Sequence, residues 1–395
     1  MSDHLPEEII EKILFRLPVK SLIKFTVVCK SWLSLIKTSA FIQSHLCTII
    51  DINNQNDAHL LLLSAYSAEE SVCSEHHWLH WDSPEFGEYS KLVNPSPIFF
   101  EMRVLGTCNG LVCLESAHDW ACSPALIWNP SIRKIVMLPT PPICFASAKY
   151  RKYTSHGFGY DSHSNDYKVL RVVSLCGDHS DLTRFTTVVQ VYSLARGTWK
   201  SLSASVVPVD LQAGGSERPD FVKGSLHTLE FRLVVFYDDH HGEHVKGGGD
   251  MFIASFNLST EEFGEIMIPE VLQRDRSCSI SRYGETLALI KDKDYNSRDP
   301  ASCGCDIWIM KEYGVAESWT FLYNIAMVEA TVYGFKRCGE VVLKETDDGR
   351  QSRMLSLDPK SKQVMVFGTK DHIYYFMDTF VESLVLLDHA IAVSY

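Results

Sequence analysis

The chain has 395 residues, of which 46% are hydrophobic and 22% charged, and its net charge is −12 at pH 7. These are ordinary values for a folded protein with a substantial core. No apolar run reaches the roughly 18 residues that a membrane-spanning helix needs, and the N-terminus lacks the pattern of a secretory signal. We therefore expect no membrane partner and a location in the cytoplasm or the nucleus.

The charge is unevenly divided along the chain. Residues 1–46 carry six basic and four acidic residues, a balance of +2, which leaves −14 on the remainder. An acidic surface repels phosphate backbones, so nucleic acid is not expected as a partner. The acidic remainder would favour encounter with a basic protein, although solubility alone explains the same charge.

Residues 5–18 predict a short helix. Pro6 suits a first helical turn, Glu7 and Glu8 favour the positive end of the helix dipole, and Pro18 ends the helix. Apolar residues at helical spacing form one broad stripe. Its members are Ile9, Ile10, Ile13, Leu14 and Leu17.

Two further short helices are predicted over residues 19–28 and 29–36. Three such helices offer little core of their own, so a module of this kind commonly gains stability by docking on a partner. We expect Ile13, Phe25 and Trp32 to pack inside the module. The residues expected to have too few internal partners, and so to act as anchors in a partner's groove, are Leu5, Pro6, Ile9, Leu14, Leu17 and Pro18.

From about residue 58 the pattern changes to short β-like runs separated by turns. Five units recur, and most of them share one order: a glycine turn, an inner strand, a strand with a large apolar residue, a polar turn and a third strand. A repeat of roughly 40–50 residues made of short strands is typical of propeller blades. The middle strands are centred on Trp128, Tyr192, Phe256, Trp308 and Leu355.

The last two predicted strands, 373–376 and 380–387, are expected to pair with the early strands around 58–114. This pairing would complete a sixth blade and close the ring, which removes exposed sheet edges. The predicted fold is therefore mainly β, with a three-helix module followed by a β-propeller of six blades. A β-sandwich, or two smaller β domains, is the alternative.

The N-terminal residues resemble the F-box pattern from end to end. The matching residues are Leu5-Pro6, Ile9-Ile10, Ile13-Leu14, Leu17-Pro18, Lys20-Ser21-Leu22 and Val28-Cys29-Lys30-Ser31-Trp32. The rest is similar to the plant F-box-associated domain. Its marks here are Cys108–Val112, Trp128–Lys134, Gly157–Asp161, Asn165–Val169, Val191–Ser193 with Trp199, Ile307–Val315 with Glu317–Trp319, and Val381–Leu387. The resemblance implies an F-box over 1–48 and an F-box-associated propeller domain over 58–390.

The resemblance also implies a function. An F-box docks on a Skp-family adaptor and through it on a cullin scaffold, while the second domain holds a protein that is to be ubiquitinated. Within the family, the chain resembles S-locus F-box and S-locus-F-box-like proteins, which act against basic pistil ribonucleases in self-incompatibility. The residues expected to contact the adaptor are Leu5, Pro6, Ile9, Ile10, Leu14, Leu17, Pro18, Leu22, Val28, Cys29, Lys30 and Trp32.

Catalysis is not expected. The clusters His76-His77-His80 and His240-His241-His244 fall in polar stretches and are interpreted as solvated loop residues. No nucleophile elbow, metalloprotease motif or phosphate-binding glycine motif occurs, and no cofactor or metal is predicted. A propeller hydrolase is the remote alternative, and an F-box scaffold that does not promote degradation is another.

Contacts with a target are expected from loops between strands. The candidate loops are 71–90, 140–155, 174–186, 206–220, 237–250 and 292–304. The tryptophans at 128, 199, 308 and 319 are expected to pack within and between blades. The twelve cysteines are interpreted as reduced, small hydrophobic residues. Double glycines do not recur once per blade, so a kelch repeat fits loosely.

Overall fold

The structure, a computed structural model, describes residues 6–67, 75–95, 102–116, 124–144, 151–176, 185–203, 219–238, 242–273, 277–293, 304–327, 330–347, 351–367 and 372–395. The chain divides into two compact units. Unit 1 comprises the helices, the strands up to Leu138 and the C-terminal residues from Tyr374, and unit 2 comprises residues 139–373 with 119–122.

The chain begins with four helices, one more than predicted. They are α1 (Glu7–Leu14), α2 (Val19–Phe25), α3 (Lys30–Ile36) and α4 (Ser39–Asn56). Pro6 and Pro18 precede α1 and α2, where a missing N–H costs nothing. Thr38 caps α4 by accepting a hydrogen bond from the Phe41 N–H at 3.2 Å, and Asp57 ends it with a φ of 53°. Among the described residues no single helix is long and apolar enough to span a membrane, although α3 and α4, which are bent by 69°, pass that test as a pair.

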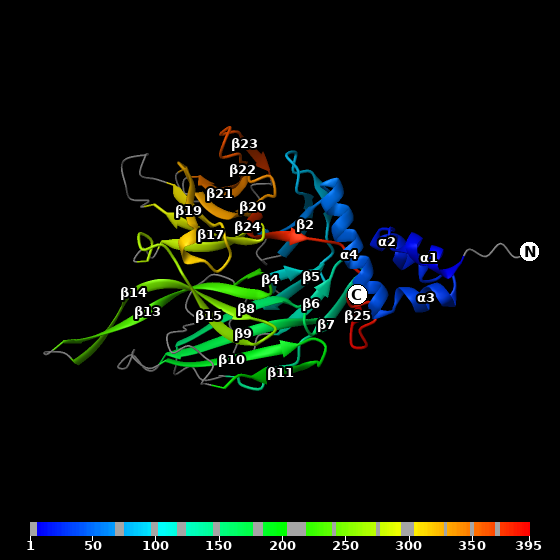
Figure 1. Ribbon diagram of the computed structural model, residues 1–395, viewed down its shortest axis with the longest axis horizontal. Helices are drawn as coiled ribbons and strands as arrows, with labels where there is room; N and C mark the ends of the chain where they lie inside the picture. Colours follow the sequence, from blue (N-terminus) through cyan, green and yellow to red (C-terminus); the bar gives the residue numbers. More distant parts are fainter. Residues whose placement is uncertain are drawn as a thin grey trace, which may run out of the picture. The chain divides into compact units, whose positions relative to one another are not determined.

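The described strands form six antiparallel sheets, here named blades A to F, as predicted. Unit 1 holds blades A and B (Figure 1). In spatial order, blade A is β24 (His372–Phe380), β1 (Leu60–Ser67), β2 (Glu75–Trp81) and β3 (Glu88–Lys91). Blade B is β25 (Val393–Ser394), β7 (Lys134–Met137), β6 (Ala125–Asn129), β5 (Leu111–Ser116) and β4 (Met102–Cys108).

Unit 2 holds the other four blades. Blade C is β8 (Arg151–Asp161), β9 (Asp166–Cys176), β10 (Phe185–Ser193) and β11 (Thr198–Ser201), and blade D is β12 (Asp220–Val222), β13 (Ser225–Asp238), β14 (Gly242–Asn257) and β15 (Glu262–Met267). Blade E is β16 (Cys278–Tyr283), β17 (Thr286–Asp292), β18 (Cys305–Met310) and β19 (Trp319–Ile325), with the short 3₁₀ helix η2 (Ala316–Ser318) before β19. Blade F is β20 (Ala330–Phe335), β21 (Val341–Asp347), β22 (Gln351–Leu357) and β23 (Val364–Phe367).

Each repeat thus contains four strands, and the strand before the glycine turn was not predicted. The glycine turn itself is confirmed: Asn109-Gly110 has φ values of 52° and 81°, and Lys223-Gly224 has 47° and 79°. Two consecutive positive φ values define the tight turn whose twist matches antiparallel strands.

The polar turn after the third strand of a blade also repeats. In blades B, D and F it begins with an Asn or Asp whose Oδ1 accepts a hydrogen bond from the backbone N–H two residues later, at 2.8–2.9 Å. These residues are Asn129, Asn257 and Asp358. The fifth residue of each turn has a positive φ, and the same is true of Gly197 in blade C.

Neighbouring blades share apolar cores. Buried Leu62 and Leu79 of blade A pack with Trp128 of blade B in one cluster within unit 1. In unit 2 three such clusters join C to D, D to E and E to F. The pattern explains why inner strands such as β1 and β5 bury residues on both sides of their sheets.

The C-terminal part of the chain differs partly from the prediction. β24 does pair with β1, as expected for closure. The second predicted strand, 380–387, is wrong beyond Phe380, because residues 381–384 have no regular structure and Leu386 has a φ of 75°. An apolar run of this length cannot be distinguished from a strand by its pattern alone.

Candidate functional site

The four helices form a small core, and α4 completes it. Leu14, Leu22 and Ile36 are buried, and the ring of Phe41 on α4 stacks on that of Phe15 with centroids 4.7 Å apart. His45 is also buried, and its Nε2 donates a hydrogen bond to the Leu17 carbonyl at 2.9 Å. Burial lowers the pKa of His45, so this ring is neutral at pH 7.

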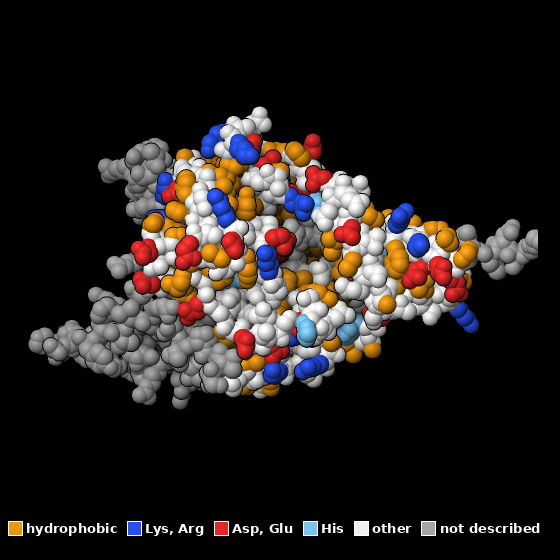
Figure 2. All heavy atoms as spheres, in the orientation of Figure 1, with side chains coloured by type: hydrophobic (Ala, Val, Ile, Leu, Met, Phe, Trp, Pro, Cys, Tyr) orange, Lys and Arg blue, Asp and Glu red, His pale blue; other side chains and the backbone are white. Residues whose placement is uncertain are grey.

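Several large aliphatic side chains of the same helices are not buried. Ile9 is 42% exposed and Ile13 48%, while Val27 and Val28, between α2 and α3, are 86% and 58% exposed. We call these four residues the exposed apolar set. Side chains of hydrophobic, basic and acidic type share the surface of the helices in Figure 2. So many large apolar side chains on so short a segment indicate an interaction surface.

The residues predicted to bind a partner fall into four groups. Leu5 lies outside the described residues. The exposed ones are Pro6, Ile9, Pro18, Val28, Cys29 and Lys30, and the half-buried ones are Ile10, Leu17 and Trp32. Leu14 and Leu22 are buried, at 1% and 0% exposure.

The sequence interpretation of the first helix was therefore wrong at two neighbouring positions. Leu14 was expected to lack internal partners, whereas it is buried and Ile13 is exposed. The reason is α4, which covers the C-terminal end of α1 through Phe41 and His45. Leu22, which was expected to face inward or toward a partner, faces inward and belongs to the core of the module. Phe25 and Trp32 do pack together, with ring centroids 5.4 Å apart.

Exposed basic side chains lie on the same segment as the exposed apolar set, together with the exposed acids Glu7 and Glu8. The basic residues are Lys12, Arg16, Lys20, Lys24 and Lys30. Cys29, which precedes α3, is exposed as well, and a hydrogen bond from Ser31 and the Trp32 backbone N–H lower the pKa of its thiol. The surface thus combines apolar anchors with positive charge.

The predicted target-binding loops are only partly described. The segment 71–90 was expected to be a loop, but it contains β2 and β3; the segment 237–250 contains the ends of β13 and β14. Residues 145–150, 177–184, 204–218 and 294–303, which make up most of the other loops, lie outside the described residues. The site at which a target would bind is therefore a prediction.

The histidine interpretation also needs correction. In β2 the alternation of buried and part-buried residues places His77 inside blade A at 1% exposure, where its Nδ1 lies 2.7 Å from the Ser64 Oγ. Burial, and then the neighbouring His76, lower the pKa of His77 to about 3. The side chains of the second cluster, at 240, 241 and 244, lie outside the described residues. Period-two alternation was the signal that could have identified β2.

The tryptophans pack as predicted. Trp128 is fully buried and Trp319 is 8% exposed, while Trp199 and Trp308 lie against Tyr192 and Phe321 of adjacent strands. One cysteine differs from expectation, because Cys144 is disulfide-bonded. No cluster of His, Cys, Asp or Glu among the described residues could hold a metal ion.

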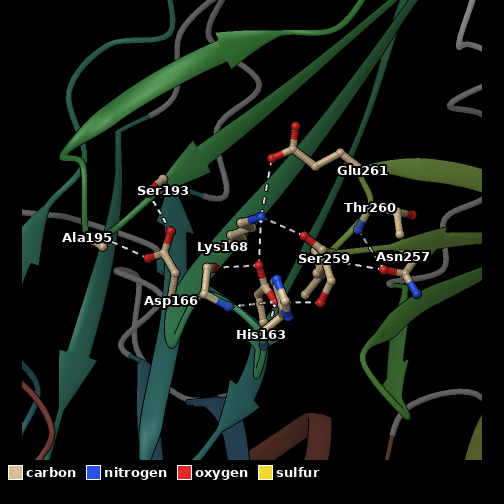
Figure 3. Close-up of polar contacts among 12 residues, drawn as sticks. His163, Asp166, Lys168, Ser193, Ala195, Asn257, Ser259, Thr260 and Glu261 are labelled. Carbon is tan, nitrogen blue, oxygen red and sulfur yellow. Dashed lines mark hydrogen bonds and ion pairs between the residues drawn. The ribbon is translucent and has the colours of Figure 1, made fainter.

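A buried ionic cluster joins blades C and D (Figure 3). The Lys168 side chain is 8% exposed, and its Nζ lies 3.0 Å from the Asp161 Oδ2, 3.2 Å from the Glu261 Oε1 and 2.6 Å from the Leu258 carbonyl oxygen. Ser259 also donates to Asp161. All three protons of the ammonium group are used, so the cluster is a structural joint.

The charges of this cluster are held in place electrostatically. Burial would raise the pKa of Asp161, but hydrogen bonds from Ser164, Ser259 and Lys168 outweigh it and hold that pKa well below its ordinary value. For Glu261, bonds from Lys200 and Lys168 likewise outweigh burial and lower the pKa. Both carboxylates are ionised at neutral pH.

A second joint connects blades D and E. The Nε2 of buried His227 on β13 lies 2.7 Å from the hydroxyl of Tyr313, and burial lowers the pKa of this histidine to about 4. Trp319 donates its Nε1–H to the Met267 carbonyl at 3.1 Å. Motif residues singled out in the sequence thus hold neighbouring blades together.

Comparison with known families agrees with this geometry. Residues 2–44 match the F-box domain, and residues 66–387 match the F-box associated beta propeller domain. Because the second match covers most of the chain, the protein belongs to the family of F-box proteins with an F-box associated β-propeller domain. The predicted fold class is confirmed.

The relatives are plant proteins. The chain is 26% identical to the Arabidopsis thaliana F-box protein CPR1 over 97% of this chain and 89% of that protein. It is 25% identical to an Arabidopsis thaliana F-box/kelch-repeat protein over 82% and 79%. Among solved structures, TolB from Acinetobacter baumannii aligns at 8% identity and a TM-score of 0.47 over 87% of this chain and 73% of TolB.

Proposed function

We propose that the protein is the substrate-recognition subunit of an SCF-type ubiquitin ligase and has no catalytic activity of its own. In this proposal the F-box docks on a Skp-family adaptor, and through it on a cullin scaffold, in the cytoplasm or the nucleus. The propeller domain binds the protein that is ubiquitinated. The observation that carries the proposal is the exposed apolar set on a module that matches the F-box family.

Docking would use that set as anchors. A partner that covers the exposed apolar set would remove its apolar area from water. Each Å² of apolar area buried contributes about 25 cal/mol to the binding free energy. The residues are Ile9, Ile13, Val27 and Val28. The surrounding lysines would favour a partner whose rim is acidic, and this contribution should weaken as salt concentration rises. Leu14 and Leu22 would act indirectly, by keeping the module folded.

The docking proposal predicts a large loss of affinity when charge is placed in the exposed apolar set. The double variant Ile9→Glu, Val28→Glu should bind a purified Skp-family adaptor at least 100-fold more weakly, because two carboxylates would have to be buried without partners. Its thermal unfolding should match that of the native chain, since both side chains are exposed. Surface plasmon resonance measures the affinity.

The matched control is Val271→Glu in unit 2, because Val271 is a valine of similar exposure, 67%, outside the F-box. It should bind the adaptor like the native chain. Unchanged binding by the double variant would contradict the docking proposal.

A narrower proposal concerns the target. The charge of −14 outside residues 1–46 suits a basic protein, and pistil S-ribonucleases in self-incompatibility are of that kind. Exposed acidic residues on blades D and E contribute to this charge, among them Glu262, Glu265, Glu270, Glu312 and Glu317. Charge complementarity of this sort raises association rates more than it fixes specificity.

The target proposal predicts binding that depends on salt and on the identity of the basic protein. A pistil S-ribonuclease should bind with a Kd that rises at least tenfold between 50 and 300 mM salt, on the order expected when exposed charges are screened. Lysozyme, which is basic but unrelated, should bind at least tenfold more weakly. Equal binding of the two would contradict recognition, and the target's half-life with and without the chain would separate degradation from scaffolding.

A further inference from the structure

The C-terminal segment 381–395 is fixed to blades A and B by buried contacts. The Asn129 Nδ2 donates to the carbonyl oxygens of Ser383 at 3.0 Å and of Val385 at 2.7 Å. Leu384 and Leu386 are 0% and 2% exposed. The segment is therefore a rigid part of unit 1, although it has no regular structure over most of its length.

The last residue adds a further attachment. The hydroxyl of Tyr395 accepts a hydrogen bond from the Trp128 Nε1–H at 2.7 Å and donates one to the Val93 carbonyl at 3.0 Å. Trp128 belongs to blade B, and Val93 follows the last strand of blade A. One side chain thus links the segment to both blades.

The segment contacts the F-box directly at one point, and a second contact reaches it through Tyr89 of β3 in blade A. Ser39, the first residue of α4, donates to the Asp388 Oδ2 at 2.7 Å. The Lys20 Nζ of α2 lies 5.5 Å from the centroid of the Tyr89 ring, and the hydroxyl of Tyr89 donates to the Glu382 Oε2 at 3.4 Å. A cation over an aromatic face is attracted by the negative face of the ring.

The second contact brings three types of group together. Tyr89 is half-buried and packs edge-on against Trp81 on the neighbouring strand, with centroids 4.9 Å apart. Glu382 is also half-buried. Burial raises its pKa, while Lys20 and Tyr89 oppose that rise. The positive charge of Lys20 therefore faces both a ring and a carboxylate.

These contacts supplement a short covalent link. α4 ends at Asn56 and β1 begins at Leu60, so only three residues connect the F-box to blade A. A short connection alone leaves a hinge, because a few backbone angles can rotate. Two non-covalent contacts, on α2 and on α4, would prevent that rotation.

We infer that residues 381–395 act as a strut that holds the F-box in one orientation on blades A and B, through Lys20–Tyr89–Glu382 and Ser39–Asp388. The strut is a property of the chain itself. If the proposed function holds, and only then, it also means that a protein bound to these blades is presented to the ligase in one direction.

The strut can be tested by measuring a distance distribution. Fluorophores would be placed through non-natural amino acids at Ser34 on α3 and Met137 on β7, both exposed, and single-molecule energy transfer would be recorded on the full chain. The strut variant combines Lys20→Met, Glu382→Gln and Asp388→Ala. The control combines Lys24→Met, Glu312→Gln and Asp51→Ala, exposed residues of the same types.

The native chain and the control should each give one narrow distribution, and the strut variant one at least twice as wide. A broad native distribution, or a strut variant as narrow as the control, would overturn the inference. Each variant loses one exposed lysine of α2, so the adaptor affinities of the strut variant and the control should agree with each other within twofold. If no chain binds the adaptor, the proposed function fails, while the distance distribution of the free chain still decides the strut.

Discussion

Replacing Gly110 with alanine is expected to lower the free energy of unfolding by about 3 kcal/mol. Gly110 has a φ of 81°, which costs about 1 kcal/mol for a residue with a Cβ. An added Cβ would also overlap the Val381 carbonyl oxygen and the Ser383 side chain, both in the strut. Because a backbone oxygen cannot move aside by a rotamer change, the C-terminal segment itself would have to shift.

Gly224 provides the matched control for this prediction. It occupies the same position in the glycine turn of blade D, with a φ of 79°, but an added Cβ would have nothing within 4 Å. Gly224→Ala should therefore cost only the backbone strain, about 1 kcal/mol. Urea denaturation measures both variants, and equal losses would show that contact with the strut contributes nothing at Gly110.

The six-bladed fold could be predicted because each repeat carries a strong local signal. A glycine turn and a large apolar residue on the third strand recur in most units, and both reflect local constraints: a positive φ and a buried face. In blades B to F the first strand in chain order was missed. β8 shows why, since its apolar alternation is interrupted at Gly157 and Gly159, where a Cβ would meet Leu226 at 2.8 Å or overlap Phe221. Those glycines are required because blade D packs closely against β8. A single sequence does not show that contact between blades.

The errors at the helices have a different cause. Whether Ile13 or Leu14 is buried depends on which neighbour covers α1, and that neighbour, α4, was not predicted. Its inward-facing residues do recur at helical spacing, as Phe41, Ile42, His45, Leu46 and Ile49. Whether each residue of the predicted docking set is exposed or buried thus depends on tertiary packing.

The family motifs of blade C could be recognised but not interpreted from the sequence. Asp161 and Lys168 lie on either side of the β8–β9 turn, whereas Glu261 is almost a hundred residues further along. Only the structure brings the three together. In the sequence these charged residues are typical of an exposed turn. Only their burial in the structure distinguishes the ionic cluster from such a turn.

Lys168→Met is expected to lower the free energy of unfolding by about 3–5 kcal/mol at pH 7, because it leaves Asp161 without its cationic partner in a buried site. Lys200 provides the control: it also binds Glu261, at 2.5 Å, but is 61% exposed. Lys200→Met should cost about 1 kcal/mol or less. Similar losses for the two lysines, measured by urea denaturation, would show that burial does not strengthen the joint.

The same joint fixes the direction of the pH dependence. A carboxyl whose pKa is depressed on folding stabilises the protein above its unfolded pKa, about 4, and this stabilisation is lost as pH falls through the lower folded value. Asp161 and Glu261 both have depressed pKa values, so the native chain should lose stability below about pH 4.5. In Lys168→Met, protonation of the carboxylates removes the negative charge that has lost its cationic partner. The difference in free energy of unfolding between the native chain and Lys168→Met should therefore shrink as the pH is lowered from 7 to 3. A constant difference would show that Lys168 acts through packing of its alkyl chain and not through its charge.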